Sequence, residues 1–100
     1  MNYKNIITNV AKTLDPGLAI KVTIVTNEDL GEAHFVVAFI EYPERDIWIP
    51  FIVYNDGEVY MPSDWEACLP VTAADIDHTK WVSFRDDSPL YIINGLPRVF

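Results

Sequence analysis

Apolar residues recur every three to four positions along the first stretch of the chain and predict an amphipathic helix over residues 3–14. They are Tyr3, Ile6, Ile7, Val10, Ala11 and Leu14. Asn2 is a suitable N-cap, and Asp15-Pro16-Gly17 is expected to end the helix. The apolar stripe of this helix is expected to pack against the rest of the fold.

The next two segments have the patterns of strands. Residues 18–26 alternate between apolar and polar positions, which predicts a half-buried strand, and residues 27–32 predict a polar turn. Residues 34–42 are apolar on both faces and predict a central strand. One face of this strand has Phe35, Val37 and Phe39, and the other has Val36, Ala38 and Ile40.

The segment from Asp46 to Pro62 is predicted to form a β-hairpin with Asp56-Gly57 as a two-residue type I′ loop. Such a loop predicts the cross-strand pairs Asn55–Glu58, Tyr54–Val59, Val53–Tyr60 and Ile52–Met61. Pro50 has no N–H to donate to a ladder, so the first strand is expected to have a bulge or an edge-like segment there.

The elements predicted after Pro62 are short. Ser63-Asp64-Trp65-Glu66 matches the S/T-x-x-E capping box and predicts a short helix through Cys68. A further helical turn is expected over residues 72–76, and strands are expected over 80–84 and 90–93. Trp48 and Trp65 are expected in the core.

Together these elements predict an α+β fold in two layers. The N-terminal helix packs on a mainly antiparallel sheet, a meander of about five to six strands, because short connections favour antiparallel neighbours. The 100 residues are expected to form a single globular domain over 1–100.

Charge is distributed unevenly along the chain. Of the 15 acidic residues, twelve lie in residues 28–77 beside a single base, Arg45, and the net charge of the chain is −8. Such a field repels nucleic acids and anionic membrane surfaces and attracts basic partners over long range. Neither direct nucleic-acid binding nor membrane binding is expected. Solubility alone is the other explanation for this charge.

Two further features bear on the compartment. Residues 1–5 lack the pattern of a signal peptide, and no apolar run approaches the roughly 20 residues of a membrane span. Cys68 is the only cysteine, which excludes an internal disulfide and fits a reducing compartment. The expected location is cytoplasmic.

Patterns for catalysis and metal binding are weak. His34, His78 and Cys68 are far apart in the sequence, and Asp75-x-Asp77-His78 supplies too few ligands for a zinc site. The four glycines fit neither a P-loop nor a dinucleotide fingerprint, and no G-x-S-x-G elbow occurs. We therefore expect no enzymatic activity, no cofactor and no metal site.

The leading hypothesis is a small acidic inhibitor that binds and neutralises a basic partner protein. Bacterial immunity proteins and phage-encoded anti-defence proteins have this size and charge, and a nucleic-acid enzyme is one candidate partner, with the acids imitating its substrate. Tyr and Trp beside the acids support an interface, since both are enriched in binding hot spots. The residues expected to contact the partner are Glu41, Glu44, Asp46, Asp56, Glu58, Tyr60, Asp64 and Glu66.

Two alternatives stay open at this point. The first alternative is a structural or assembly subunit that oligomerises through sheet edges, which the high aromatic and apolar content of the chain favours. The other alternative is a small-ligand binder or enzyme with a pocket between helix and sheet. A monomer and a small homo-oligomer are both compatible with the leading hypothesis.

Overall fold

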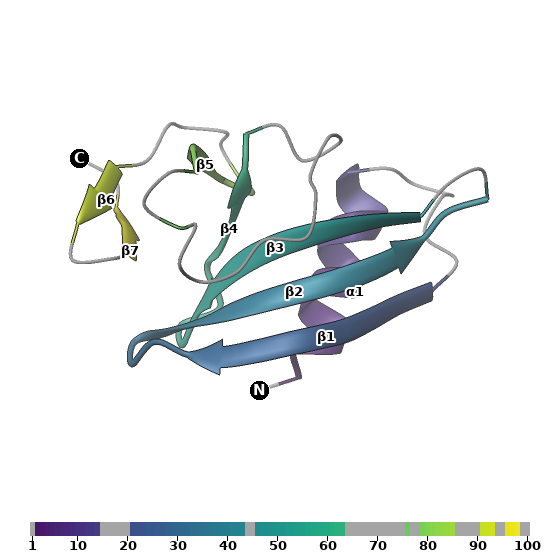
Figure 1. Cartoon of the computed structure of the whole chain (residues 1–100), viewed down its shortest axis with the longest axis horizontal. Coiled ribbons are helices and arrows are strands. Elements are labelled where there is room, and N and C mark those ends of the chain that lie inside the picture. Colours follow the sequence, from purple (N-terminus) through teal and green to yellow (C-terminus); the bar gives the residue numbers. More distant parts are fainter. Residues whose placement is uncertain are drawn as a thin grey trace.

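One helix and seven strands are described in the computed structural model, which covers residues 2–14, 21–43, 46–63, 76, 79–85, 91–93 and 96–98. β1 to β5 form one antiparallel sheet in chain order, and β6 and β7 form a separate two-stranded sheet (Figure 1). The predicted α+β fold with a meander is therefore confirmed. The elements are α1 (Tyr3–Leu14), β1 (Lys21–Asp29), β2 (Ala33–Glu41), β3 (Asp46–Tyr54), β4 (Val59–Pro62), β5 (Trp81–Ser83), β6 (Tyr91–Ile93) and β7 (Leu96–Arg98).

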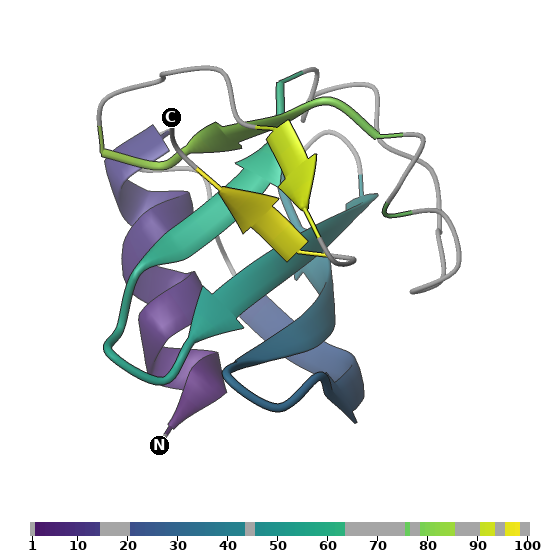
Figure 2. The ribbon, with the colours of Figure 1, turned by 90° about the vertical axis from the view of Figure 1, so that its left-hand side faces the viewer.

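Helix α1 forms over the predicted residues and has the predicted N-cap. The backbone N–H of Asn5 donates to Asn2 Oδ1 at 3.1 Å, which satisfies one of the free donors of the first turn. The apolar stripe buries Ile7, Val10 and Ala11 in a cluster shared with one face of the sheet. Figure 2 shows α1 lying along that face, so the helix and the sheet form two layers.

Strand β1 runs further than the sequence predicts, since it ends at Asp29 rather than at Thr26. Residues 27–29, expected in a turn, instead pair with β2. A bulge between Ile24 and Thr26 shifts the register, and Val25 at the bulge is 48% exposed. Polar residues fit this part of β1 because an edge strand leaves most of its side chains in solvent.

Strand β2 is the central strand that its apolar pattern predicts, and it pairs with β1 on one side and β3 on the other. Its pairing with β3 covers nine residues, from Ala33–Tyr54 to Glu41–Asp46. Alternate side chains of these strands fill two buried clusters. The helix-face cluster contains Val36, Ala38, Ile40, Ile47, Ile49, Phe51 and Val53. The opposite-face cluster contains Ala33, Phe35, Val37, Ile52 and Tyr54.

The hairpin of β3 and β4 exists, but its predicted register is wrong by one residue. Gly57 N donates to Tyr54 O at 2.9 Å and Tyr54 N donates to Glu58 O at 2.9 Å, so the loop has three residues. Gly57 takes the left-handed position at the end of this loop, with a φ of +93°. A two-residue type I′ loop would require a positive φ at Asp56 as well.

The observed register follows from the burial pattern of β4. Val53 pairs with Val59 and Ile52 pairs with Tyr60, which replaces the predicted pairs of Val53 with Tyr60 and Ile52 with Met61. This alignment places Val59 and Met61 in the helix-face cluster. The predicted register would have turned both side chains to the other face, because a shift of one residue reverses every side chain of a strand.

Pro50 lies in an edge-like segment, which is one of the two arrangements predicted for it. It stays in regular register with Val37 of β2, so this pairing has no bulge at the proline. On the other side, β4 pairs with β3 only at Ile52 and Val53. The missing N–H of Pro50 therefore costs no ladder hydrogen bond in the described sheet.

The tryptophan that anchors the opposite-face cluster is Trp81 of β5, which the sequence analysis did not single out. It is 1% exposed, and its Nε1–H donates to Ile76 O at 3.1 Å. Trp48, expected in the core, is half-buried at the margin of this cluster, with its ring 5.0 Å from that of Phe39. Trp65 lies outside the described residues.

The C-terminal strands differ from the prediction in their pairing. β5 and β6 lie within the predicted segments 80–84 and 90–93, but β6 pairs with β7 and does not join the main sheet. β7 was not predicted, because Pro97 at its centre opposes a strand assignment. The helices predicted at 63–68 and 72–76 fall outside the described residues, apart from Ser63 and Ile76.

Substitution of Gly57 by alanine should lower the free energy of unfolding by about 1–2 kcal/mol, because a Cβ disfavours the left-handed backbone. No atom lies within 4 Å of an added Cβ there, so the cost comes from the backbone and not from a clash. Urea denaturation measures the change. Gly57→Asn should lose less, since asparagine tolerates this conformation better, and equal stability of all three proteins would contradict the assignment.

Candidate functional site

Two turns that are distant in the sequence meet at one end of the sheet (Figure 1). Residues 30–32 connect β1 to β2, and residues 55–58 connect β3 to β4. Asn55 joins them with two hydrogen bonds. Its backbone N–H donates to Glu32 O at 3.1 Å, and its Nδ2 donates to Gly31 O at 3.2 Å. The two turns are therefore held at a fixed separation by one side chain and one backbone amide.

Each turn also fixes a carboxylate within itself. The Gly31 N–H donates to Asp29 Oδ1 at 2.8 Å, and the Glu58 N–H donates to Asp56 Oδ1 at 3.0 Å. Gly31 has a φ of +95°, so glycine is required there for the same backbone reason as at Gly57. These bonds restrain both carboxylates at the surface, and each retains a second oxygen that can accept further hydrogen bonds.

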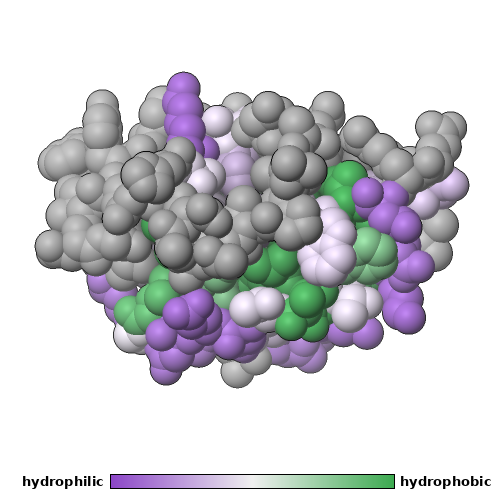
Figure 3. Space-filling view, in the orientation of Figure 1, coloured by the Kyte–Doolittle hydropathy of each residue, from purple (hydrophilic) through white to green (hydrophobic). Residues whose placement is uncertain are grey.

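The meeting of the turns gathers acidic residues from β1 and both connections. We name this surface the acidic end; its members are Glu28, Asp29, Glu32, Asp56 and Glu58. The chain also places a cation there, since Arg85 Nη1 lies 3.1 Å from Glu58 Oε1. Figure 3 shows hydrophilic side chains at this end of the sheet.

The N-terminal end of α1 reaches the acidic end through His34. The Tyr3 ring lies 5.0 Å from the His34 imidazole, and His34 Nδ1 lies 2.8 Å from Asn27 Oδ1. His34 is thus a packing and hydrogen-bonding residue between helix and sheet. Its contacts tie α1 to the strand that carries Glu28 and Asp29, so the helix supports the position of the acids.

The structure divides the residues that were predicted to bind a partner. Asp56 and Glu58 belong to the acidic end, whereas Glu41 and Asp46 form a cross-strand pair at the other end of β2 and β3. β3 has nine residues, so the two groups lie roughly 26 Å apart at the usual rise of a strand. Glu44, Asp64 and Glu66 lie outside the described residues.

Glu28, Asp29 and Glu32 were not among the predicted contact residues. The sequence did signal them, because residues 27–32 have the composition of an acidic turn. What it did not show was that this turn lies beside Asp56. That neighbourhood depends on the alignment of β1, β2 and β3, and therefore on pairing between residues far apart in the chain.

Tyr60, the one aromatic residue among the predicted contacts, packs on Tyr54 on the opposite face of the sheet. Their rings lie 5.2 Å apart in an edge arrangement at 69°, and Tyr60 is half-buried. Burial raises the pKa of Tyr54 from 10.0 to about 12, with smaller contributions from Tyr60 and Asp56. The Tyr54 phenol is therefore a neutral packing group at ordinary pH.

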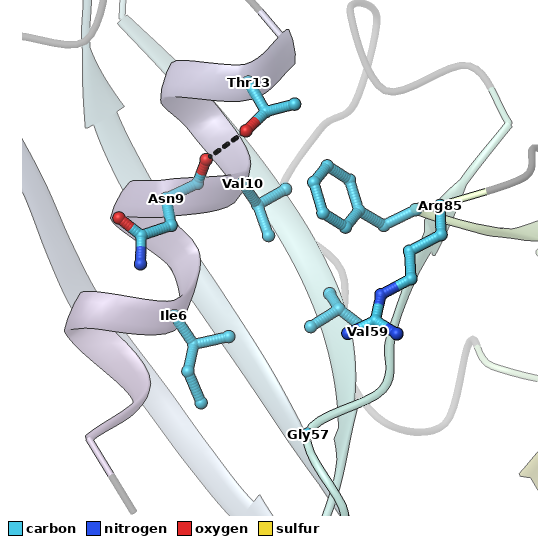
Figure 4. A pocket seen from close by; sticks show the side chains of 8 residues that line it. Ile6, Asn9, Val10, Thr13, Gly57, Val59 and Arg85 are labelled. Atoms are coloured by element: carbon cyan, nitrogen blue, oxygen red, sulfur yellow. Dashed lines mark hydrogen bonds between the residues drawn. The ribbon is translucent and has the colours of Figure 1, made fainter.

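An open groove of about 190 Å³ borders the acidic end (Figure 4). It lies between α1 and the segment from the β3–β4 turn to Arg85. Apolar side chains of Ile6, Val10, Val59 and Phe84 line it together with Asn9, Thr13, Gly57 and Arg85. Because Arg85 also pairs with Glu58, the groove and the acidic end are continuous. We name this feature the α1 groove.

Metal-ligating side chains are dispersed over the described residues. No group of three or more His, Cys, Asp or Glu side chains within them has the arrangement of a metal site. Cys68 and His78 fall outside the described ranges. Among the helices that the structure describes, none is long and apolar enough to cross a membrane. The acidic end and the α1 groove together present restrained hydrogen-bond acceptors beside an apolar depression.

Comparisons of the chain with protein-family models, curated proteins and solved structures found no match.

The raised pKa of Tyr54 predicts a loss of stability at high pH. A folded-state pKa above the unfolded value leaves stability intact below pH 10.0 and reduces it as the pH rises from 10.0 to about 12. Tyr54→Phe, which cannot ionise, should lose less stability over this interval in urea denaturation. Wild type should also show a late rise in tyrosinate absorbance that the variant lacks, and identical titrations of the two proteins would refute the shift.

Proposed function

We propose that this protein is a small acidic inhibitor, of the immunity or anti-defence type, that binds a basic partner protein through the acidic end. The observation that supports the proposal most is the double hydrogen bond of Asn55, which joins the two acidic turns. Through it, acids from two separate hairpins are held in one array before any partner arrives. Preorganised charges of this kind avoid part of the ordering cost of binding.

The acidic end would act mainly on the rate and the specificity of association. A cluster of like charges attracts an oppositely charged protein over long range, and the attraction weakens with salt. Exposed charge pairs add little affinity each, typically up to about 1 kcal/mol. A tight complex therefore also needs an apolar anchor, and the adjoining α1 groove is suited to receive one aliphatic or aromatic side chain of the partner.

The chemistry expected of the partner follows from these two features. It is a protein with a cluster of Lys or Arg next to an exposed apolar side chain. A nucleic-acid enzyme fits this description, because its substrate groove is basic. Nucleic acid itself is repelled by the acidic end, and the cytoplasm, where such enzymes act, is the location that we propose.

Removal of charge from the acidic end, without loss of its shape, should weaken partner binding. Glu32→Gln with Asp56→Asn keeps the side-chain sizes and an oxygen for the turn hydrogen bond of Asp56. Loss of two surface charge pairs should lower affinity roughly tenfold at low salt. Affinity capture from bacterial lysate first identifies basic proteins, and calorimetry with the purified partner then measures affinity and its salt dependence.

Glu41→Gln with Asp46→Asn is the matched control, since it removes the same charge at the other end of the sheet. It should bind nearly as wild type does. An equal effect of both double variants would mean that only net charge matters and would contradict the acidic end as the contact surface. Failure of every purified candidate to bind, or to lose activity when bound, would contradict the proposed inhibition.

Filling of the α1 groove should weaken the same complex without any change of charge. Thr13 is exposed at the rim of the groove, so Thr13→Trp places an indole into it at little cost to the core. Partner affinity should fall tenfold or more, about 1.4 kcal/mol, as expected for loss of an anchor pocket. Asn5→Trp, on an exposed position of α1 that does not line the groove, is the control. Unchanged affinity of both would exclude the groove.

A further inference from the structure

The outer edge of β1 is open along its whole length in the described part of the chain. β1 is the first strand of the sheet and pairs there only with β2, over residues 21–29 (Figure 1). The backbone N–H and C=O groups that point away from β2 have no described strand beside them. An edge of nine residues is long enough to accept a further strand.

The centre of this edge lacks the usual protection against pairing. Edge strands are commonly blocked by a charge or a proline in mid-strand. Residues 22–26 are instead Val-Thr-Ile-Val-Thr, five consecutive β-branched residues with high strand propensity and no charge. Val25 is the exposed large hydrophobic residue among the described residues, at 48%. The bulge at Val25 is the one protective device that this edge shows.

The charges of β1 lie at its two ends and have opposite signs. Lys21 begins the strand, and Glu28 and Asp29 end it. Lys21 pairs with Glu41 and Glu28 pairs with Phe35, and these β2 residues are an even number of positions apart. Lys21 and Glu28 therefore project from the same face of the sheet.

We infer that β1 pairs antiparallel with β1 of a second copy of this chain. In that arrangement Lys21 of each copy lies near Glu28 of the other, on one face of the joined sheet. A parallel pair would place like charges together, which is unfavourable. The two bulges meet at the twofold axis, so residues 21–23 of one copy pair with residues 26–28 of the other. The two Val25 side chains then lie close to this axis.

The pairing joins two five-stranded sheets into a continuous sheet across the axis. Two other open stretches in the described sheet are less suited to this role. The outer edge of β5, the last strand of the sheet, is only three residues long. Along residues 46–51 of β3, Pro50 removes a donor from the edge. The charges of β1 favour a second copy over a strand from another protein. When two copies of β1 pair antiparallel, the positive first residue of each strand lies beside the negative last residues of the other. Such self-complementarity is what a twofold interface requires.

The first experiment measures molar mass by light scattering and sedimentation, from low micromolar to near-millimolar chain concentration. The wild type should shift from monomer to dimer. Val25→Lys should weaken dimerisation about tenfold or more, because it places like charges near the axis. Asn5→Lys, which adds the same charge on an exposed position of α1 outside the α1 groove, should dimerise as the wild type does. Thermal melts confirm that each variant folds.

The second experiment tests the orientation by reversing charges. Lys21→Glu alone and Glu28→Lys alone should each weaken the dimer, because each homodimer then faces two like-charged pairs. An equimolar mixture of the two variants should form a heterodimer, and the double variant with both changes should dimerise again.

Three results would overturn the inference. They are a wild type that stays monomeric over the whole range, a dimer unaffected by Val25→Lys, and charge variants that do not complement each other. Protection of β1 amides from hydrogen exchange only in complex with a different protein would also overturn it, since that result assigns the edge to a foreign strand. None of these results bears on the Asp56 and α1 groove variants, so the dimer and the proposed partner interface are tested separately.

Discussion

The pairing of β2 with β3 is the constraint on which the rest of the structure depends. It runs through nine residue pairs without a shift and alternately supplies both buried clusters. A slip of one residue would exchange the contents of the two faces, so the burial on each side enforces the alignment. The helix, β4 and Trp81 all pack on surfaces that this pair defines.

The same alignment determines where the loops lie. Because β2 and β3 are antiparallel and of equal length, the connection before β2 and the connection after β3 come to one end of the sheet. Asn55 then bonds to Glu32 and Gly31 at a place where the ladder would otherwise stop. The acidic end is thus a direct product of core packing, and its charges are carried on restrained turns rather than on free loops.

Much of this architecture follows from the sequence, and the errors have identifiable causes. A period of three to four located α1, a period of two located β1, and a continuous apolar run located β2, because such patterns report burial on one element at a time. The Asp56-Gly57 pair correctly predicted a hairpin. The predicted type of loop was wrong, because a two-residue loop and a three-residue loop can both use Gly57. Only the burial of Val59 and Met61 selects the three-residue loop.

By itself the sequence determined the class of fold, the central position of β2, the N-cap at Asn2 and the acidic character of the middle segment. Only the tertiary structure decided which acids are neighbours. Asp56 and Glu58 lie with Glu28, Asp29 and Glu32, far from Glu41 and Asp46, although the sequence places all of them in one acidic block. It also decided that β1 is an edge and that Trp81 anchors a cluster. The physical reason is the same in each case: strand order and register are set by contacts between distant residues, which local patterns do not record.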